Sequence, residues 1–127
     1  MDNATKELKQ AALEFLRLAS SGKVREAYQL YIADDFRHHN AYFKGDRQSL
    51  MTAMEQNATK NPNQIFEIHR ALQDGEFVAV HSHVRQKPGD PGAAVVHIFR
   101  FKDNRVVEFW DVGQPVPTDK INENGMF

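Results

Sequence analysis

Residues 93–117 read AAVVHIFRFKDNRVVEFWDVGQPVP, and this stretch decides the fold. Two apolar runs, rich in β-branched and aromatic residues, flank a short polar segment, which is typical of a β-hairpin. The sequence therefore predicts strands over 93–101 and 105–112. His97 stands within the first run and Asp111 within the second. An imidazole and a carboxylate in an otherwise apolar wall are what a small proton-transfer pocket requires.

The turn between these strands decides whether the two side chains share a face of the sheet. A three-residue loop, with Asn104 in the left-handed conformation that Asn tolerates, places Phe101 opposite Arg105. Because side chains alternate between faces, this register puts His97 and Asp111 on the same side. A two-residue loop would shift the pairing by one and separate them. We favour the three-residue loop because it gathers the aromatic residues on one face. The remaining members of that predicted face are Val95, Phe99, Phe101, Val107 and Phe109.

The composition is that of an ordinary globular protein, with 41% hydrophobic and 26% charged residues among 127. This length predicts a single domain over 1–127. The net charge of −1 argues against nucleic acid or an anionic membrane as a partner. The absence of cysteine excludes disulfides and thiolate chemistry. No apolar run is long enough to cross a membrane, and the polar N-terminus is unlike a signal peptide, so we expect a cytoplasmic protein.

The order of predicted elements indicates the fold class. Apolar residues at helical spacing predict helices over 3–20, 23–33 and 46–60, the last with Asp46 as its N-cap. Strand-like runs follow at 65–72 and 76–86, before the hairpin described above. Helices followed by at least four long antiparallel strands predict an α+β fold. A curved sheet wrapped against helices leaves an internal cavity, in which inward-facing polar residues matter.

Four stretches carry a resemblance to a known family. They are DDFRHHN at 34–40, VAVHSHV at 78–84, VVHIFRFKDNRVVEFWDVGQPVP at 95–117 and NENGMF at 122–127. Together with the order of elements, they resemble the SnoaL-like polyketide cyclases of the nuclear transport factor 2-like superfamily, over essentially the whole chain. The resemblance implies a cone-shaped α+β fold in which three N-terminal helices pack on a curved antiparallel sheet.

The resemblance also implies a catalytic pair. In cyclases of this family an aspartate on the last strand acts as acid and base in an intramolecular aldol condensation, and a histidine on the preceding strand polarises the substrate carbonyl. Asp111 and His97 hold the corresponding strand positions. The family uses no metal and no organic cofactor. The resemblance further places His39 and Asn40 at the mouth of the cavity, where they would complete a polar cluster with the catalytic pair.

Further residues are candidates for binding a substrate. His81 and His83 alternate along one strand, so both face the same side, and we expect them to line the pocket. Two histidines at this spacing also suit a metal ion, but a third ligand would have to come from another segment. Apolar ligands favour aromatic walls, which points to Phe99, Phe109 and Trp110.

The sequence as a whole predicts a cofactor-independent acid/base enzyme of the aldol cyclase, isomerase or dehydratase type. Its substrate would be a largely apolar carbonyl compound held in an internal pocket. The alternative is a non-catalytic small-molecule binding module with the same pocket, and a third hypothesis is a metal-dependent protein that uses His81 and His83. We also expect a homodimer through the outer face of the sheet, which would cover apolar positions such as Ile98 and Val106.

Overall fold

The computed structural model describes residues 2–127, with side chains from residue 8 onward. Helices and strands follow one another in the order αα β α ββββ, which agrees with the predicted succession except for one early strand. The elements are α1 (Asp2–Ser20), α2 (Val24–Tyr31), β1 (Ile32–His38), α3 (Arg47–Lys60), β2 (Ile65–Asp74), β3 (Phe77–Arg85), β4 (Ala93–Lys102) and β5 (Arg105–Pro115). The predicted N-cap is confirmed, because the Asp46 side chain accepts a hydrogen bond from the Ser49 backbone N–H.

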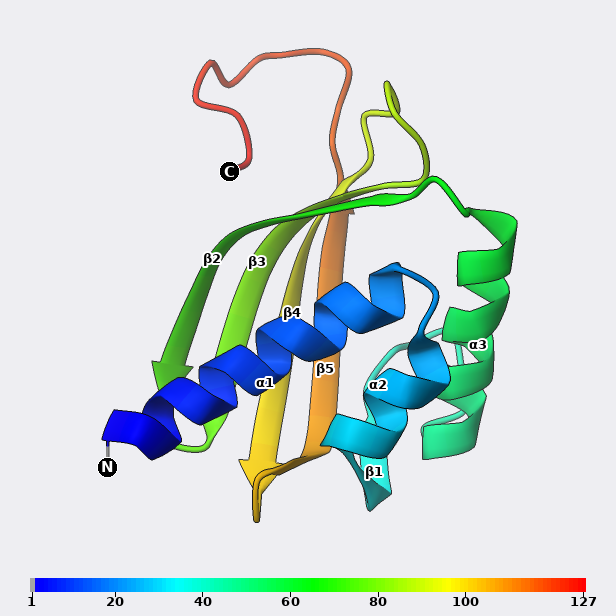
Figure 1. Ribbon diagram of the computed structural model, residues 1–127. Helices are drawn as coiled ribbons and strands as arrows, with labels where there is room; N and C mark the ends of the chain where they lie inside the picture. Colours follow the sequence, from blue (N-terminus) through cyan, green and yellow to red (C-terminus); the bar gives the residue numbers. More distant parts are fainter. Residues whose placement is uncertain (1) are drawn as a thin grey trace.

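The strands form one five-stranded sheet in the order β1-β5-β4-β3-β2. Strands β2 to β5 are antiparallel neighbours, but β1 runs parallel to β5, so the sheet is mixed. The expectation of a purely antiparallel sheet was therefore wrong. In Figure 1 the sheet is curved, α1 crosses its inner face, and α2 and α3 lie beside β1.

Strand β1 was missed because the predicted helix over 23–33 continues into it. The helix ends at Tyr31, and Ile32 already has extended backbone angles. Burial then alternates, with Phe36 and His38 buried and the intervening Arg37 exposed. An alternation of period two in the sequence indicates a β-strand, but the two adjacent aspartates at 34–35 interrupt this pattern.

The turn between β4 and β5 differs from the predicted three-residue loop, but it also leaves His97 and Asp111 on one face of the sheet. The turn has two residues, Asp103 and Asn104, with φ of 53° and 64°, as in a type I′ turn. Between this turn and the pair Arg100–Glu108 the register shifts by one residue, which is a β-bulge. The bulge restores the alternation, so His97 and Asp111 share a face as predicted. They also pair directly, whereas the predicted register sets Phe109 opposite His97.

The same bulge changes which apolar residue of β5 enters the core. Val106 is fully buried on the helical side, although we predicted it on the outer face, and Val107 is only half-buried. Val106 therefore cannot contribute to a dimer surface. The predicted homodimer itself stays a prediction.

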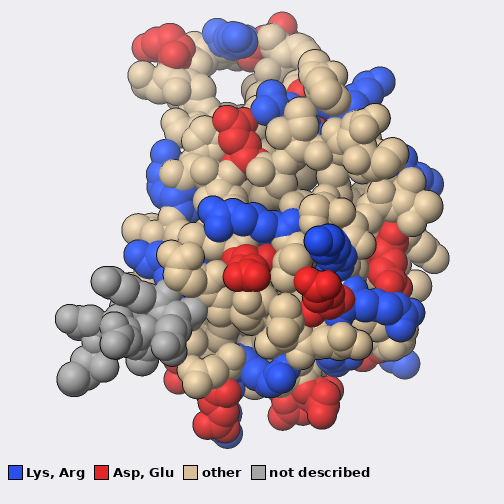
Figure 2. Space-filling model, viewed as in Figure 1, with Lys and Arg blue, Asp and Glu red and all other residues tan. Residues whose placement is uncertain are grey.

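The core lies between α1, α2 and the inner face of the sheet. Phe15 of α1 packs edge-on against Phe99 and Phe109 and contacts the ring of Tyr28 from α2. On the outside, Figure 2 shows acidic and basic side chains intermingled over the helical side. No helix in the described part of the chain is long and apolar enough to cross a membrane.

Candidate functional site

A cavity of about 250 Å³ opens between the helices and the inner face of the sheet. His97 of β4 and Asp111 of β5 both line it, as the shared face predicted. The walls around them are mostly apolar, and amide and hydroxyl groups stand on the helical side. The other lining residues are Leu16, Ala19, Ser20, Met54, Asn57, Gln64, Phe66, Val84 and Val95.

The imidazole of His97 is held between two aromatic rings. The ring centroid of Phe66 lies 5.7 Å away on one side and that of Phe109 lies 5.4 Å away on the other. Burial lowers the pKa of His97 to about 4, with a smaller opposing effect from the charge of Asp111. The ring is therefore neutral at pH 7, and one of its nitrogens carries a proton that it can donate.

His97 also has an unmet hydrogen bond. Its Nδ1 atom is buried and has no partner among the described residues. A buried polar atom left without a partner costs roughly 1–3 kcal/mol, so such atoms are uncommon unless a function requires them. His97 is also among the residues that line the cavity, which is where a ligand-binding or catalytic residue would lie.

Asp111 is oriented by Asn40, which follows β1. Asn40 Nδ2 donates to Asp111 Oδ2 over 2.8 Å. The orientation of this amide is fixed, because its other end, Oδ1, accepts the backbone N–H of Tyr42 at 2.9 Å. One carboxylate oxygen of Asp111 is thus engaged by an amide. Asn40 therefore contacts Asp111, as predicted, but it is not among the residues that line the cavity.

The segment that carries Asn40 is anchored by His38. The Nδ1 of His38 accepts the backbone N–H of Asn40 at 3.1 Å, and its Nε2 lies 2.7 Å from the Lys44 carbonyl oxygen. Because a backbone N–H only donates and a carbonyl only accepts, His38 must carry its proton on Nε2. This histidine is structural, and it fixes the loop that aims Asn40 at Asp111.

His39 and Trp110 do not reach the cavity, contrary to the prediction. Their rings stack almost parallel at 5.0 Å on the outer face of the sheet, next to Phe77. Alternation along the strands explains this placement, because Trp110 neighbours the inward-facing Phe109 and Asp111. His39 likewise stands between inward-directed His38 and Asn40.

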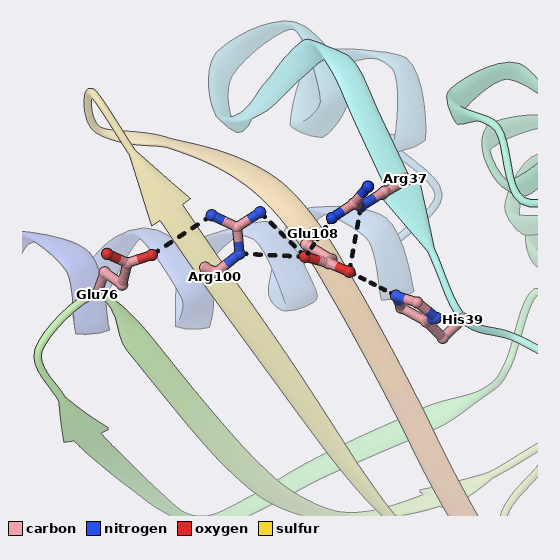
Figure 3. Close-up of polar contacts among 5 residues, drawn as sticks. All are labelled: Arg37, His39, Glu76, Arg100 and Glu108. Atoms are coloured by element: carbon pink, nitrogen blue, oxygen red, sulfur yellow. Dashed lines mark hydrogen bonds and ion pairs between the residues drawn. The ribbon is translucent and has the colours of Figure 1, made fainter.

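On that outer face His39 joins a network centred on Glu108 (Figure 3). Glu108 accepts hydrogen bonds from Arg100 at 3.0 and 3.1 Å and forms an ion pair with Arg37 at 3.2 Å. His39 Nε2 lies 2.6 Å from Glu108 Oε2, the oxygen that Arg37 also contacts, whereas Arg100 binds Oε1. His39, with help from both arginines and against burial, lowers the pKa of Glu108 to about 2. Arg100 and Glu108 thus pair across neighbouring strands.

His81 and His83 also project from the outer face and do not line this cavity. Both stack on Phe127, at 5.4 and 4.4 Å, and His69 of the neighbouring strand stacks on the same ring. His83 Nε2 contacts the Pro91 carbonyl oxygen, and His81 contacts Arg70. No group of three potential metal ligands occurs among the described residues. The expected role of both histidines in the pocket is therefore corrected.

Phe99 and Phe109 point inward but belong to the core. They are essentially unexposed, and neither is among the residues that line the cavity. Phe109 instead supports His97 from behind. The aromatic residue that does line the cavity, Phe66, was missed, as were Met54, Asn57 and Gln64. They come from α3, from β2 and from the loop between these elements. Their contact with β4 is a consequence of tertiary packing, which no local sequence motif indicates.

The family model of the SnoaL-like domain matches residues 12–109. The chain belongs to this family. No curated protein sequence matches it. Among solved structures, wild-type IdmH, a polyketide cyclase candidate from Streptomyces antibioticus, superposes with a TM-score of 0.69 at 19% identity. The superposition covers 84% of this SnoaL-like chain and 91% of that protein.

Two other solved structures have a similar fold. AclR, a hydroxylase candidate from Streptomyces galilaeus, has a TM-score of 0.73 at 21% identity, over 86% of this chain and 90% of that one. A candidate polyketide cyclase from Acidithiobacillus ferrooxidans has a TM-score of 0.68 at 20% identity, over 85% and 88% of the two chains. At such identities the likeness shows the nuclear transport factor 2-like fold alone.

Proposed function

We propose that residues 1–127 form one SnoaL-like domain that catalyses cofactor-independent proton transfer next to a carbonyl group. The reaction would be of the aldol cyclase, isomerase or dehydratase type. The observation that carries this proposal is the pairing of His97 with Asp111 at one cavity. A neutral imidazole with an unmet Nδ1 hydrogen bond stands directly across the hairpin from a carboxylate oriented by Asn40.

The chemistry follows from these two groups. Asp111 removes a proton from the carbon next to the substrate carbonyl, and the electron pair of the broken C–H bond moves onto the carbonyl oxygen. His97 donates its N–H to that oxygen and stabilises the developing enolate. Asp111 then returns the proton to carbon or to a leaving hydroxyl. Asn40 keeps one carboxylate oxygen engaged, so that the other is directed to the substrate.

The relatives support this class of reaction without naming the substrate. The chain belongs to the SnoaL-like family, and two of the superposed structures are described as polyketide cyclase candidates. An aldol cyclisation begins with removal of a proton next to a carbonyl, which is the step assigned to Asp111.

Replacing Asp111 tests the proposal. Asp111→Asn keeps the shape of the side chain but removes the base, so we expect a loss of at least about hundredfold in proton exchange. The measurement is incorporation of solvent deuterium next to the carbonyl of small ketones, followed by proton NMR. Asp74→Asn, an exposed change at the end of β2, serves as the matched control and should leave exchange unchanged.

The same experiment distinguishes the enzymatic proposal from the alternative of a non-catalytic binding module. If the wild-type chain binds ketones but exchanges none of their hydrogens, the enzymatic proposal is wrong and the chain is a binding module. Full exchange in a folded Asp111→Asn variant would remove Asp111 from the mechanism.

A further inference from the structure

We propose that this cavity selects a small, electrically neutral carbonyl compound that carries a second oxygen for the amides of Asn57 and Gln64. The inference rests on the proposed function for the identity of the reacting carbonyl. The inference also rests on the volume of the cavity and on the charges and hydrogen-bonding groups of the residues that line it.

The size of the cavity limits the substrate. Its volume of about 250 Å³ lies below the range of roughly 300–1,000 Å³ typical of drug-sized ligands. A volume below this range indicates a compound smaller than a typical drug, such as a single ring or a short chain. A flat system of four fused rings would extend beyond such a cavity.

The charges around the cavity favour a neutral compound. No lysine or arginine stands among the described residues that line it, and Asp111 contributes a negative charge. His97 adds no positive charge at pH 7, because burial lowers its pKa to about 4. A carboxylate or phosphate placed here would lose its hydration without gaining a cationic partner, which is costly.

Two amides on the helical wall provide the second recognition point. Gln64 Nε2 donates to the backbone oxygen of Ser20 at 2.8 Å, and Asn57 Nδ2 donates to Gln64 Oε1 at 3.2 Å. Asn61 Nδ2 in turn donates to Asn57 Oδ1 at 2.9 Å, which fixes the direction of the chain of bonds. Each amide nitrogen has two hydrogens, and these bonds use one of each. Both side chains line the cavity, with Gln64 half-buried and Asn57 exposed, and each nitrogen has one hydrogen left for an acceptor oxygen on the substrate.

The apolar residues of the cavity wall favour a hydrocarbon part in the substrate. Leu16, Met54, Phe66 and Val95 all line the cavity. They contact hydrocarbon well and give no hydrogen bonds. The substrate is thus apolar in its middle, with the reacting carbonyl at His97 and Asp111 and another oxygen at the helical wall.

Four ketones test the inference on the full chain. 4-Oxocyclohexanecarboxamide is neutral and carries the second oxygen across the ring. 4-Oxocyclohexanecarboxylate has the same size but a negative charge, and 4-isopropylcyclohexanone has the same size without the second oxygen. A four-ring steroid ketone exceeds the cavity. Binding is measured by NMR titration of the backbone amide signals, and deuterium exchange is recorded on the same samples.

We expect the carboxamide to bind at least about tenfold more tightly than each of the other three, which corresponds to about 1.4 kcal/mol. Asn57→Leu should remove its advantage over 4-isopropylcyclohexanone while that ketone still binds, which shows that the variant is folded. Gln48→Leu, an exposed change on the same helix, is the matched control and should preserve the advantage.

The outcomes separate this inference from the proposed function. Equal binding of the carboxylate or of the four-ring ketone would overturn the inference, even if Asp111-dependent exchange showed that the proposed function holds. Selective binding of the carboxamide without exchange of any hydrogen would support the selection of neutral compounds and refute catalysis. Equal binding of the carboxamide and 4-isopropylcyclohexanone would remove the role of the two amides.

Discussion

At the scale of a single residue, burial determines the protonation state of the His97 imidazole. Its ring is enclosed by Phe66 and Phe109, and the loss of hydration lowers its pKa to about 4. The neighbouring Asp111 raises that pKa, but burial is the larger effect. A histidine in this state donates a hydrogen bond as a neutral group, and it stays neutral throughout the physiological pH range.

The buried imidazole predicts a pH-dependent stability. Between pH 6.5 and 4 the unfolded chain binds a proton at His97 and the folded chain does not, so the free energy of unfolding falls as pH falls. The loss reaches about 3 kcal/mol by pH 4. Urea unfolding from pH 7.5 to 4 measures it.

His97→Phe is the matched variant for this pH effect. Phenylalanine fills the same aromatic stack and has no proton to bind, so this part of the pH dependence should disappear. Identical pH profiles for the two proteins would show that His97 is not the group responsible.

At the scale of elements, the hairpin shows that a wrong local prediction can give a correct arrangement. We predicted a three-residue loop, and the structure has a two-residue turn followed by a bulge. The predicted loop takes one extra residue from β4, whereas the bulge adds one extra residue to β5. Either change puts His97 and Asp111 on one face of the sheet. The face of Val106 and Val107 depends on where the extra residue lies, and that part of the prediction failed.

The turn itself can be tested at Asn104, which has φ of 64°. A β-branched residue there is strained, so Asn104→Val should lower the free energy of unfolding by about 1–2 kcal/mol. Lys102→Val is the control, because Lys102 is exposed and ends β4 with extended backbone. Urea midpoints of the two variants measure the difference. Equal midpoints would contradict a strain that comes from the turn conformation.

At the scale of the whole molecule, the network around Glu108 joins segments that are distant in sequence. Glu108 on β5 connects β1, through Arg37 and His39, with β4, through Arg100, and Arg100 reaches Glu76 before β3 (Figure 3). The side chain of Glu108 is only 9% exposed, while that of Arg37 is 67% exposed. The carboxylate is therefore the central member, and the outer arginine contributes less.

Removing the central charge should cost stability. Glu108→Gln leaves Arg100 and His39 facing a neutral amide, and we expect a loss of about 1–2 kcal/mol in the free energy of unfolding at pH 7. Because the folded pKa of Glu108 is lowered to about 2, its contribution is present above pH 4.5 and declines as pH falls toward 2.

Glu76→Gln is the control for this network, since Glu76 is 55% exposed and bonds to Arg100 alone. We expect it to change the free energy of unfolding by less than about 0.5 kcal/mol. Urea unfolding at pH 7 compares the two variants. A loss at Glu108 no larger than that at Glu76 would show that the network adds nothing beyond ordinary surface pairs.

The sequence alone determined the succession of helices and strands apart from β1, the N-cap at Asp46, and the shared face of His97 and Asp111. These features depend on hydrophobic periodicity and on contacts between residues close along the chain. It did not determine the parallel pairing of β1 with β5, or the meeting of Asn40 with Asp111 across 71 positions.

Only the tertiary structure decided which face the other candidate residues occupy. His39, His81, His83 and Trp110 lie outside because alternation reverses at each neighbouring residue, and a bulge or strand start changes the phase. Asn57, Gln64 and Phe66 reach the cavity because α3 and β2 pack around α1, and the free energy of that packing is a sum over many distant contacts. The shared face of His97 and Asp111 could be predicted locally, whereas the residues that form the rest of the cavity wall could not.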